Sequence, residues 1–181
     1  MKENFFEVLI ANQQKQEITK VLECNDKSSR FGLVLSEEEA KGLIVSRRDT
    51  LKEQRRVEFG GGILPNLIDA FCDSEFMQQD TYAETLTELQ ELFYLYKNES
   101  RDLMTDDELM AVMRELYDTV CFGSVEYLAD TCLERFARAV RAGYEGYQNG
   151  PEDGGYSQLS EEERWDHSLY QETLWELLGA I

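Results

Sequence analysis

Proline is almost absent from this chain, and its scarcity limits the possible folds more than any other feature. Only Pro65 and Pro151 occur among 181 residues. Proline interrupts the interior of a helix, because it lacks an N–H and clashes with the preceding turn. Long proline-free stretches in which apolar residues recur every three or four positions favour helices. We therefore predict a mainly α protein, a helical bundle of six or seven helices with at most two short strands.

Capping boxes indicate where several of these helices begin. In this motif a serine or threonine side chain bonds the backbone three residues on, and a glutamate there returns the bond. The pattern fits Ser36 with Glu39, Thr105 with Glu108 and Ser160 with Glu163. We expect a helix behind each box, and another behind Ser124. The first 23 residues have apolar positions typical of one broken helix or of two, the second capped by Asn12.

Two short segments are expected to be extended. Residues 31–35, FGLVL, follow a turn-like stretch, and residues 56–59, RVEF, precede three glycines. Each is a candidate strand, and the two are expected to pair across the helix between them. The strands would be the only departure from an all-helical fold.

The domain organisation follows from one stretch that is rich in glycine and polar residues. We predict a helical domain over residues 1–146, a linker over 147–159 and a C-terminal docking helix over 160–181. Trp165 and Trp175 lie on that last helix. Two tryptophans after a linker suggest that the helix docks. It packs on its own domain, which we favour, or on a second copy of the chain.

The net charge of −19, from 37 acidic and 18 basic residues, restricts the partners. Such a chain repels nucleic-acid phosphates and anionic membranes, and it attracts basic proteins. We therefore expect no nucleic-acid and no membrane partner, although the oligomeric state stays open. A DNA mimic, with carboxylates in place of phosphates, is a weaker possibility that only the charge supports. A solvated acidic surface without a partner is the simplest alternative.

The cysteines and the N-terminus favour the cytoplasm. Cys24, Cys72, Cys121 and Cys132 are widely spaced, and no CxxC motif occurs. The start of the chain lacks the pattern of an export signal, so reduced thiols are expected over disulfides. Cys121 and Cys132 would meet if their helices pack together, but the spacing alone does not show it.

Metal and catalytic sites find little support in the sequence. His167 is the only histidine, which removes most histidine-based catalysis and most transition-metal sites. An EF-hand register with Gly32 at its turn puts Lys27 and Phe31 at calcium-ligand positions, where neither can serve. We therefore expect no metal and no cofactor, and we assign no catalytic residue.

The triple glycine raises the possibility of an anion site. Free amides at the start of a helix can hold an anion, and the main basic cluster of the chain lies just before the glycines. The motif fits neither a phosphate-binding P-loop nor a dinucleotide fingerprint, because the residues and spacing these require are absent. The alternative is structural, with glycines for tight turns and basic residues that suit a helix C-terminus. The candidate anion-binding residues are Arg48, Lys52, Arg55, Arg56, Gly60, Gly61 and Gly62.

Part of the chain resembles a known family. The stretches RVEFGGGILPNLIDAFCDS, LQELFYLYKNES, TDDELMAVM and CFGSVEYL are similar to a family of uncharacterised bacterial proteins, catalogued as a domain of unknown function. The resemblance spans residues 35–133 and implies no activity, ligand or catalytic residue.

Taken together, these observations favour a cytosolic, non-enzymatic interaction or regulatory protein with an acidic surface. The alternative is a small-anion binding protein or enzyme, for phosphate or carboxylate, that uses the Arg55/Arg56 and Gly60–Gly62 region. Whether the protein is an enzyme stays open at this point.

Overall fold

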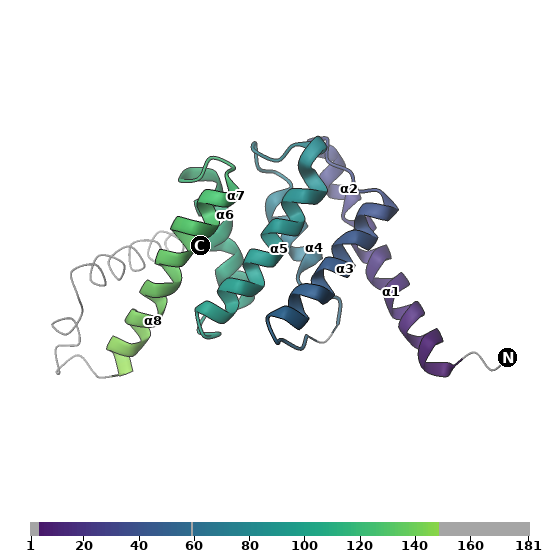
Figure 1. Cartoon of the computed structure of the whole chain (residues 1–181). Coiled ribbons are helices and arrows are strands. Elements are labelled where there is room, and N and C mark those ends of the chain that lie inside the picture. The colour runs from purple at the N-terminus through teal and green to yellow at the C-terminus, as the bar shows by residue number, and fades with distance from the viewer. Residues whose placement is uncertain (1–3, 59, 149–181) are drawn as a thin grey trace. The chain divides into compact units, whose positions relative to one another are not determined.

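The computed structural model describes residues 4–58 and 60–148, and within these ranges every regular element is a helix (Figure 1). The predicted mainly α bundle is confirmed. The helices of eight or more residues are α1 (Phe5–Glu23), α3 (Glu37–Glu53), α4 (Leu64–Phe71), α5 (Tyr82–Glu99), α6 (Asp106–Thr119) and α8 (Glu134–Gln148). The shorter elements are α2 (Asn25–Ser28), η1 (Ser29–Phe31), η2 (Gln79–Thr81), α7 (Val125–Tyr127) and the π-helical η3 (Leu128–Leu133).

The chain divides into two compact units, Met1–Glu91 and Leu92–Ile181. Each unit is considered by itself below, and α5 contributes residues to both. The end of α8 at Gln148 overlaps the first two residues of the predicted linker. The rest of that linker, the predicted docking helix and its capping box lie outside the described residues.

The helix starts predicted at Ser36, Thr105 and Ser124 are confirmed. Before α3, the Ser36 hydroxyl accepts from the Glu39 N–H at 3.2 Å, and the Glu39 carboxylate accepts from the Ser36 N–H at 2.7 Å. The same reciprocal pair joins Thr105 and Glu108 at α6. Ser124 caps α7 through the N–H of Tyr127. Each of these bonds joins residues three apart, so the local sequence was enough to predict the boundaries.

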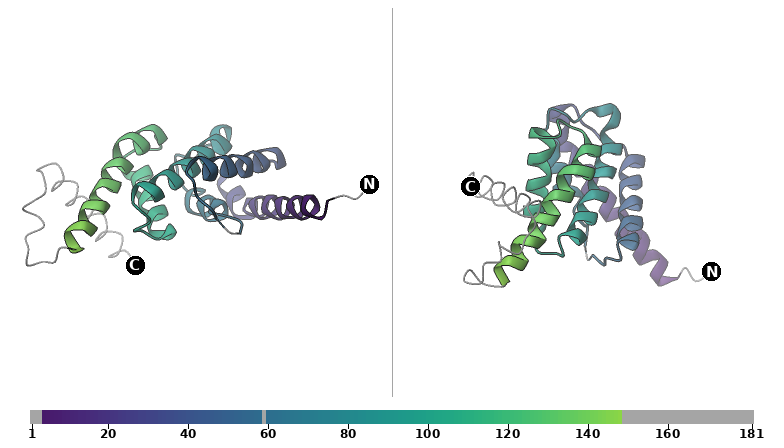
Figure 2. Two further views of the ribbon diagram at one scale, coloured as in Figure 1. Left: turned by 60° about the horizontal axis from the view of Figure 1, so that its bottom comes forward. Right: turned by 60° about the vertical axis from the view of Figure 1, so that its left-hand side comes forward.

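The N-terminal region is one helix, whereas we expected a break or two helices. Helix α1 begins after its cap, Asn4, and continues without a break through Asn12, whose side chain is exposed. It lies beside α3 and extends beyond it at the N-terminal end (Figures 1 and 2). Its buried positions, Glu17 and Val21, fall in the half that packs on α3.

The two predicted strands do not form in the described residues. The segment after Gly32 is extended, but carboxamide side chains take the place of a partner strand. Asn25 accepts from the Leu35 N–H and donates to the Leu35 carbonyl, both at 2.9 Å. Gln79 does the same for Val34, at 2.7 and 2.9 Å. A primary amide can present an N–H and its oxygen on the same side, as the N–H and C=O of one residue in a neighbouring antiparallel strand do.

Each unit has its own apolar interior. In the first unit, fully buried side chains come from α3, α4 and the start of α5, and include Leu43, Leu64, Leu67, Phe71, Tyr82 and Leu86. In the second unit, one core cluster joins the start of α6 to α8 through Met104, Val112, Phe136, Ala139 and Val140. The apolar stripes of the sequence correspond to these interiors.

Candidate functional site

The basic cluster of the first unit centres on a buried arginine. Arg47, on α3, is 4% exposed. Its guanidinium lies 3.9 Å from a Glu17 carboxylate oxygen on α1 and 3.6 Å from a Glu58 oxygen in the glycine loop. It also donates to the carbonyl of Gly60 at 3.3 Å. A buried charge is tolerated only when it is paired, so these groups account for the burial of Arg47.

Gly62 allows the loop to approach that guanidinium. Its φ is +71°, a left-handed conformation that side chains rarely adopt, and a Cβ there would lie 2.0 Å from Arg47 Nε. Gly60, at φ +88°, presents its carbonyl to the same arginine. The close approach of the loop to Arg47 therefore requires a glycine at position 62. At position 60 the loop contributes a carbonyl that accepts a hydrogen bond from the same guanidinium.

The remaining predicted anion-site residues differ in their surroundings. Arg48 is partly exposed, with a guanidinium nitrogen 3.8 Å from the second oxygen of Glu17. Lys52 is exposed near the end of α3, and Arg55 is exposed with a left-handed φ of 54°. Arg56 is half-buried, and the side chain of Lys20 lies near Gly61. The anion-binding interpretation stays a prediction, although Glu17 and Glu58 supply negative charge beside Arg47 and Arg48.

Arg47, Glu17 and Glu58 were not among the site residues predicted from the sequence. A signal was present, because Arg47 falls on the apolar stripe of α3 that contains Leu43, Ile44 and Leu51. A charged residue within such a stripe indicates a buried ion pair. The position of its partners on α1 and in the loop could not be read from local pattern.

A second candidate site is the outer face of α5 in the first unit. Glu84, Glu88 and Glu91 are exposed and follow spacings of four and three, which place them on one side of the helix. No basic side chain pairs with any of the three within the described part of the chain. Partial burial, and then the charges of Glu84 and Glu91, raise the pKa of Glu88. We call these three residues the acidic face of α5.

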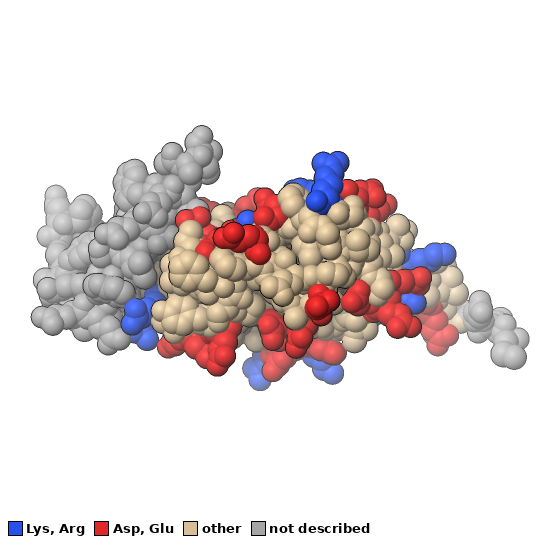
Figure 3. All heavy atoms as spheres, turned by 90° about the horizontal axis from the view of Figure 1, so that it is seen from above, with Lys and Arg blue, Asp and Glu red and all other residues tan. Residues whose placement is uncertain are grey.

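Acidic side chains also dominate the wider surface. In the view of Figure 3, red carboxylate groups cover much more of the described surface than blue basic groups do. Some are neutralised locally, such as Glu37, which lies 2.9 Å from Lys41, and Asp69, which lies 2.5 Å from Lys27. The acidic face of α5 differs from these because its carboxylates form no salt bridge within residues 4–58 and 60–148.

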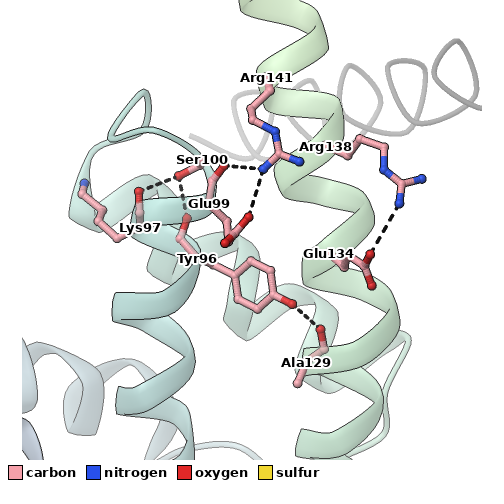
Figure 4. A network of polar contacts seen from close by, with 8 residues as sticks. All are labelled: Tyr96, Lys97, Glu99, Ser100, Ala129, Glu134, Arg138 and Arg141. Carbon is pink, nitrogen blue, oxygen red and sulfur yellow. Dashed lines mark hydrogen bonds and ion pairs between the residues drawn. The ribbon is translucent and has the colours of Figure 1, made fainter. Parts of the chain in front are cut away.

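The second unit holds a polar cleft of about 280 Å³ between α5 and α8 (Figure 4). Arg141 donates to the Glu99 carbonyl at 2.5 Å and approaches its carboxylate at 3.3 Å. Arg138 lies 3.4 Å from Glu134 on the same helix. Each arginine of the cleft thus has a carboxylate partner, and the lining offers no excess positive charge for an anion.

Tyr96 connects this cleft to an irregular helix segment. Its hydroxyl donates to the carbonyl of Ala129 at 2.5 Å (Figure 4). Ala129 lies in η3, where π-helical winding replaces the usual α-helical bonds. Burial, and then the carboxylates of Glu134, Asp130 and Glu99, raise the pKa of Tyr96 to about 12. The phenol therefore stays a neutral donor throughout the physiological pH range.

The described residues contain no group of three or more histidine, cysteine or acidic side chains placed to hold a metal ion. His167 lies outside them. Among the described helices, none combines the length and apolar character that crossing a lipid bilayer requires. The four cysteines are free thiols.

The fold and these sites define a mainly α chain with two features. One is the buried Arg47 paired with Glu17 and Glu58, which we call the arginine centre, and the other is the acidic face of α5. Residues 20–146 match the model of a family described as a family of unknown function, DUF6323. The match covers more than half of the chain, so the chain belongs to that family, as the sequence resemblance indicated. Comparisons with curated proteins and with solved structures gave no match.

Proposed function

We propose that the protein is a cytoplasmic, non-enzymatic interaction module that binds a basic partner through the acidic face of α5. The observation that carries the proposal is the set Glu84, Glu88 and Glu91, exposed on one side of a helix without a cationic partner among the described residues. Three such carboxylates repel each other, and a basic ligand would relieve that repulsion.

The surroundings of the acidic face support a fixed binding surface. On the opposite side of α5, Leu86 and Leu89 are fully buried. Gln90, also buried, donates to the carbonyl of Leu43 on α3 at 3.2 Å. These contacts hold the helix against α3, so the three carboxylates keep their spacing without a ligand. A rigid charge array binds at a lower entropic cost than one on a mobile loop.

Charge neutralisation at the arginine centre makes a small-anion function less well supported. The carboxylates of Glu17 and Glu58 lie within 4.0 Å of Arg47, and Glu17 also serves Arg48. A phosphate or carboxylate ligand would have to displace these groups or bind beside them. The acidic face of α5 requires no such rearrangement.

The test uses a fluorescent lysine-rich peptide and measures its binding by anisotropy over a range of sodium chloride concentrations. The variant Glu84→Gln/Glu88→Gln/Glu91→Gln removes three charges with little change of shape. We expect its affinity to fall roughly tenfold, since exposed charge pairs contribute about 0.2–1 kcal/mol each and three pairs at about 0.5 kcal/mol sum to about 1.5 kcal/mol. Added salt should weaken the wild type more than the variant.

The matched control is Glu38→Gln/Glu115→Gln/Glu126→Gln, which removes three exposed charges on other helices that form no salt bridge within the described residues. It makes the net charge less negative by the same three units but leaves the acidic face of α5 intact, so its affinity should stay within about twofold to threefold of the wild type. Equal losses in both variants would show that only net charge matters, and would overturn the proposed site.

A further inference from the structure

Two buried thiols of the second unit contact each other. The Sγ atoms of Cys121 and Cys132 are 3.5 Å apart. The residues are 6% and 8% exposed, so both lie just beneath the surface. The spacing of the two cysteines left this contact open, and the structure shows it between the turn after α6 and η3. Cys24 and Cys72 take no part in this pair.

The two sulfur atoms are near enough for a small movement to join them. A disulfide bond needs its sulfur atoms about 2.0 Å apart, so these two must move together by roughly 1.5 Å. Both belong to irregular backbone. Cys121 precedes a turn in which Phe122 and Gly123 have positive φ values of 47° and 81°. Cys132 lies in the π-helical η3.

That irregular backbone has features of a functional element. π-Helical segments are rare and often occur at functional sites. Phe122 is 68% exposed despite being aromatic, and its left-handed backbone is strained for a residue with a side chain. An exposed, strained turn beside a buried thiol gives small oxidants a short route to the sulfur when the turn opens.

We propose that Cys121 and Cys132 form a redox-sensitive pair that closes to a disulfide in the presence of a hydroperoxide. One thiol attacks the peroxide, which gives a sulfenic acid and releases water or an alcohol. The second thiol then attacks that sulfur, the new S–S bond forms, and a water molecule leaves. The two thiols lose two electrons in total, and these electrons reduce the peroxide.

The environment makes this a slow response. Burial, and then the hydrogen bond and charge of Cys132, raise the pKa of the Cys121 thiol to about 12. The reactive thiolate is therefore scarce at neutral pH, and the pair stays reduced until oxidant accumulates or the turn opens. We expect the rate of closure to rise with pH between 7 and 9.

The disulfide would tie the end of α6 to the π-helical segment. The cross-link restricts the unfolded chain, so the oxidised protein should melt several degrees higher than the reduced protein. It would also fix the turn that carries the exposed Phe122. The pair thereby acts as a switch between a free-thiol form and a cross-linked form of this turn.

The test is peroxide treatment of the full-length Cys24→Ser/Cys72→Ser variant, followed by alkylation and mass spectrometry. Hydrogen peroxide is the probe. We expect the number of alkylatable thiols to fall from two to zero, with peptides containing Cys121 and Cys132 linked by a bond that dithiothreitol reverses. Retention of both thiols, or irreversible sulfinic and sulfonic products without a linked peptide, would overturn the proposal.

Two single variants distinguish a reacting pair from a packing contact. In Cys132→Ser, peroxide should leave Cys121 as a sulfenic acid that dimedone traps, and in the wild type the trapped product should be at least tenfold less abundant. Cys121→Ser should give the converse. Equal trapping in the wild type and the single variants would show that the second thiol does not resolve the first, and would contradict the proposal.

Discussion

At the scale of single residues, Gly62 shows how one position determines the path of a loop. The loop can reach the buried guanidinium of Arg47 because residue 62 has no Cβ and adopts a positive φ. The sequence analysis weighed an anion site against a structural role for the three glycines. The structural role of Gly62 is now defined by a contact.

The variant Gly62→Ala should lower the free energy of unfolding by about 2–5 kcal/mol. A left-handed alanine costs about 1–2 kcal/mol, and displacement of the buried arginine adds to this loss. Urea unfolding measures the change. The control is Gly42→Ala within α3, where a Cβ meets nothing within 4 Å, and it should stabilise the helix by roughly 0.5–1 kcal/mol. Equal stability of the two variants would contradict this role for Gly62.

The neighbouring arginines of α3 should behave differently. Arg47→Ala leaves the buried carboxylate of Glu17 without its closest buried cation, and should cost about 3–5 kcal/mol of stability. Arg48→Ala removes a side chain that is 39% exposed, and should cost less than about 1 kcal/mol. Chemical denaturation of both proteins provides the comparison, and similar losses would argue against a central role for Arg47.

At the scale of secondary-structure elements, the sequence predicted what is encoded locally. The capping boxes at Ser36 and Thr105 and the cap at Ser124 begin the helices as expected, since their bonds join residues three apart. The segment at residues 33–35 was assigned to a strand because its apolar residues suit an extended chain. Its hydrogen-bond partners come from Asn25 and from Gln79, which is more than forty residues away, and no local pattern reveals such pairs.

Removal of the Asn25 carboxamide should therefore destabilise the extended segment. Asn25→Ala leaves the N–H and carbonyl of Leu35 without a protein partner, and should cost about 1–3 kcal/mol. Gln79→Ala affects the exposed Val34 and should cost less, because water can replace the lost bonds. Thermal unfolding ranks the two variants, and the reverse order would contradict this explanation.

The bond between Tyr96 and η3 predicts a loss of stability in alkaline solution. The pKa of Tyr96 is about 12 in the folded protein against 10.0 ordinarily, so folding favours the neutral phenol. Its contribution is fully present below pH 10 and is lost as the pH rises from 10 to 12. Unfolding at stepped pH should show a steeper decline for the wild type than for Tyr96→Phe. The exposed Tyr127→Phe should decline as the wild type does.

At the scale of the whole molecule, the acidic composition and the fold together determine where charge stays unbalanced. The sequence predicted an acidic surface, but it did not identify which carboxylates lack partners. Lys41 and Lys27 neutralise Glu37 and Asp69, and the arginine centre neutralises Glu17 and Glu58. Such pairings depend on tertiary contacts or rotamers, so only a structure separates paired charges from the acidic face of α5.

The most direct test of the proposed function is zero-length carbodiimide cross-linking to a lysine-rich peptide, with the linked carboxylates identified by mass spectrometry. The reaction joins only amines and carboxylates that are in contact. We predict that the cross-links concentrate at Glu84, Glu88 and Glu91 and disappear at high salt. An even distribution that includes Glu38, Glu115 and Glu126 would show that the peptide follows net charge alone, and would contradict binding at α5.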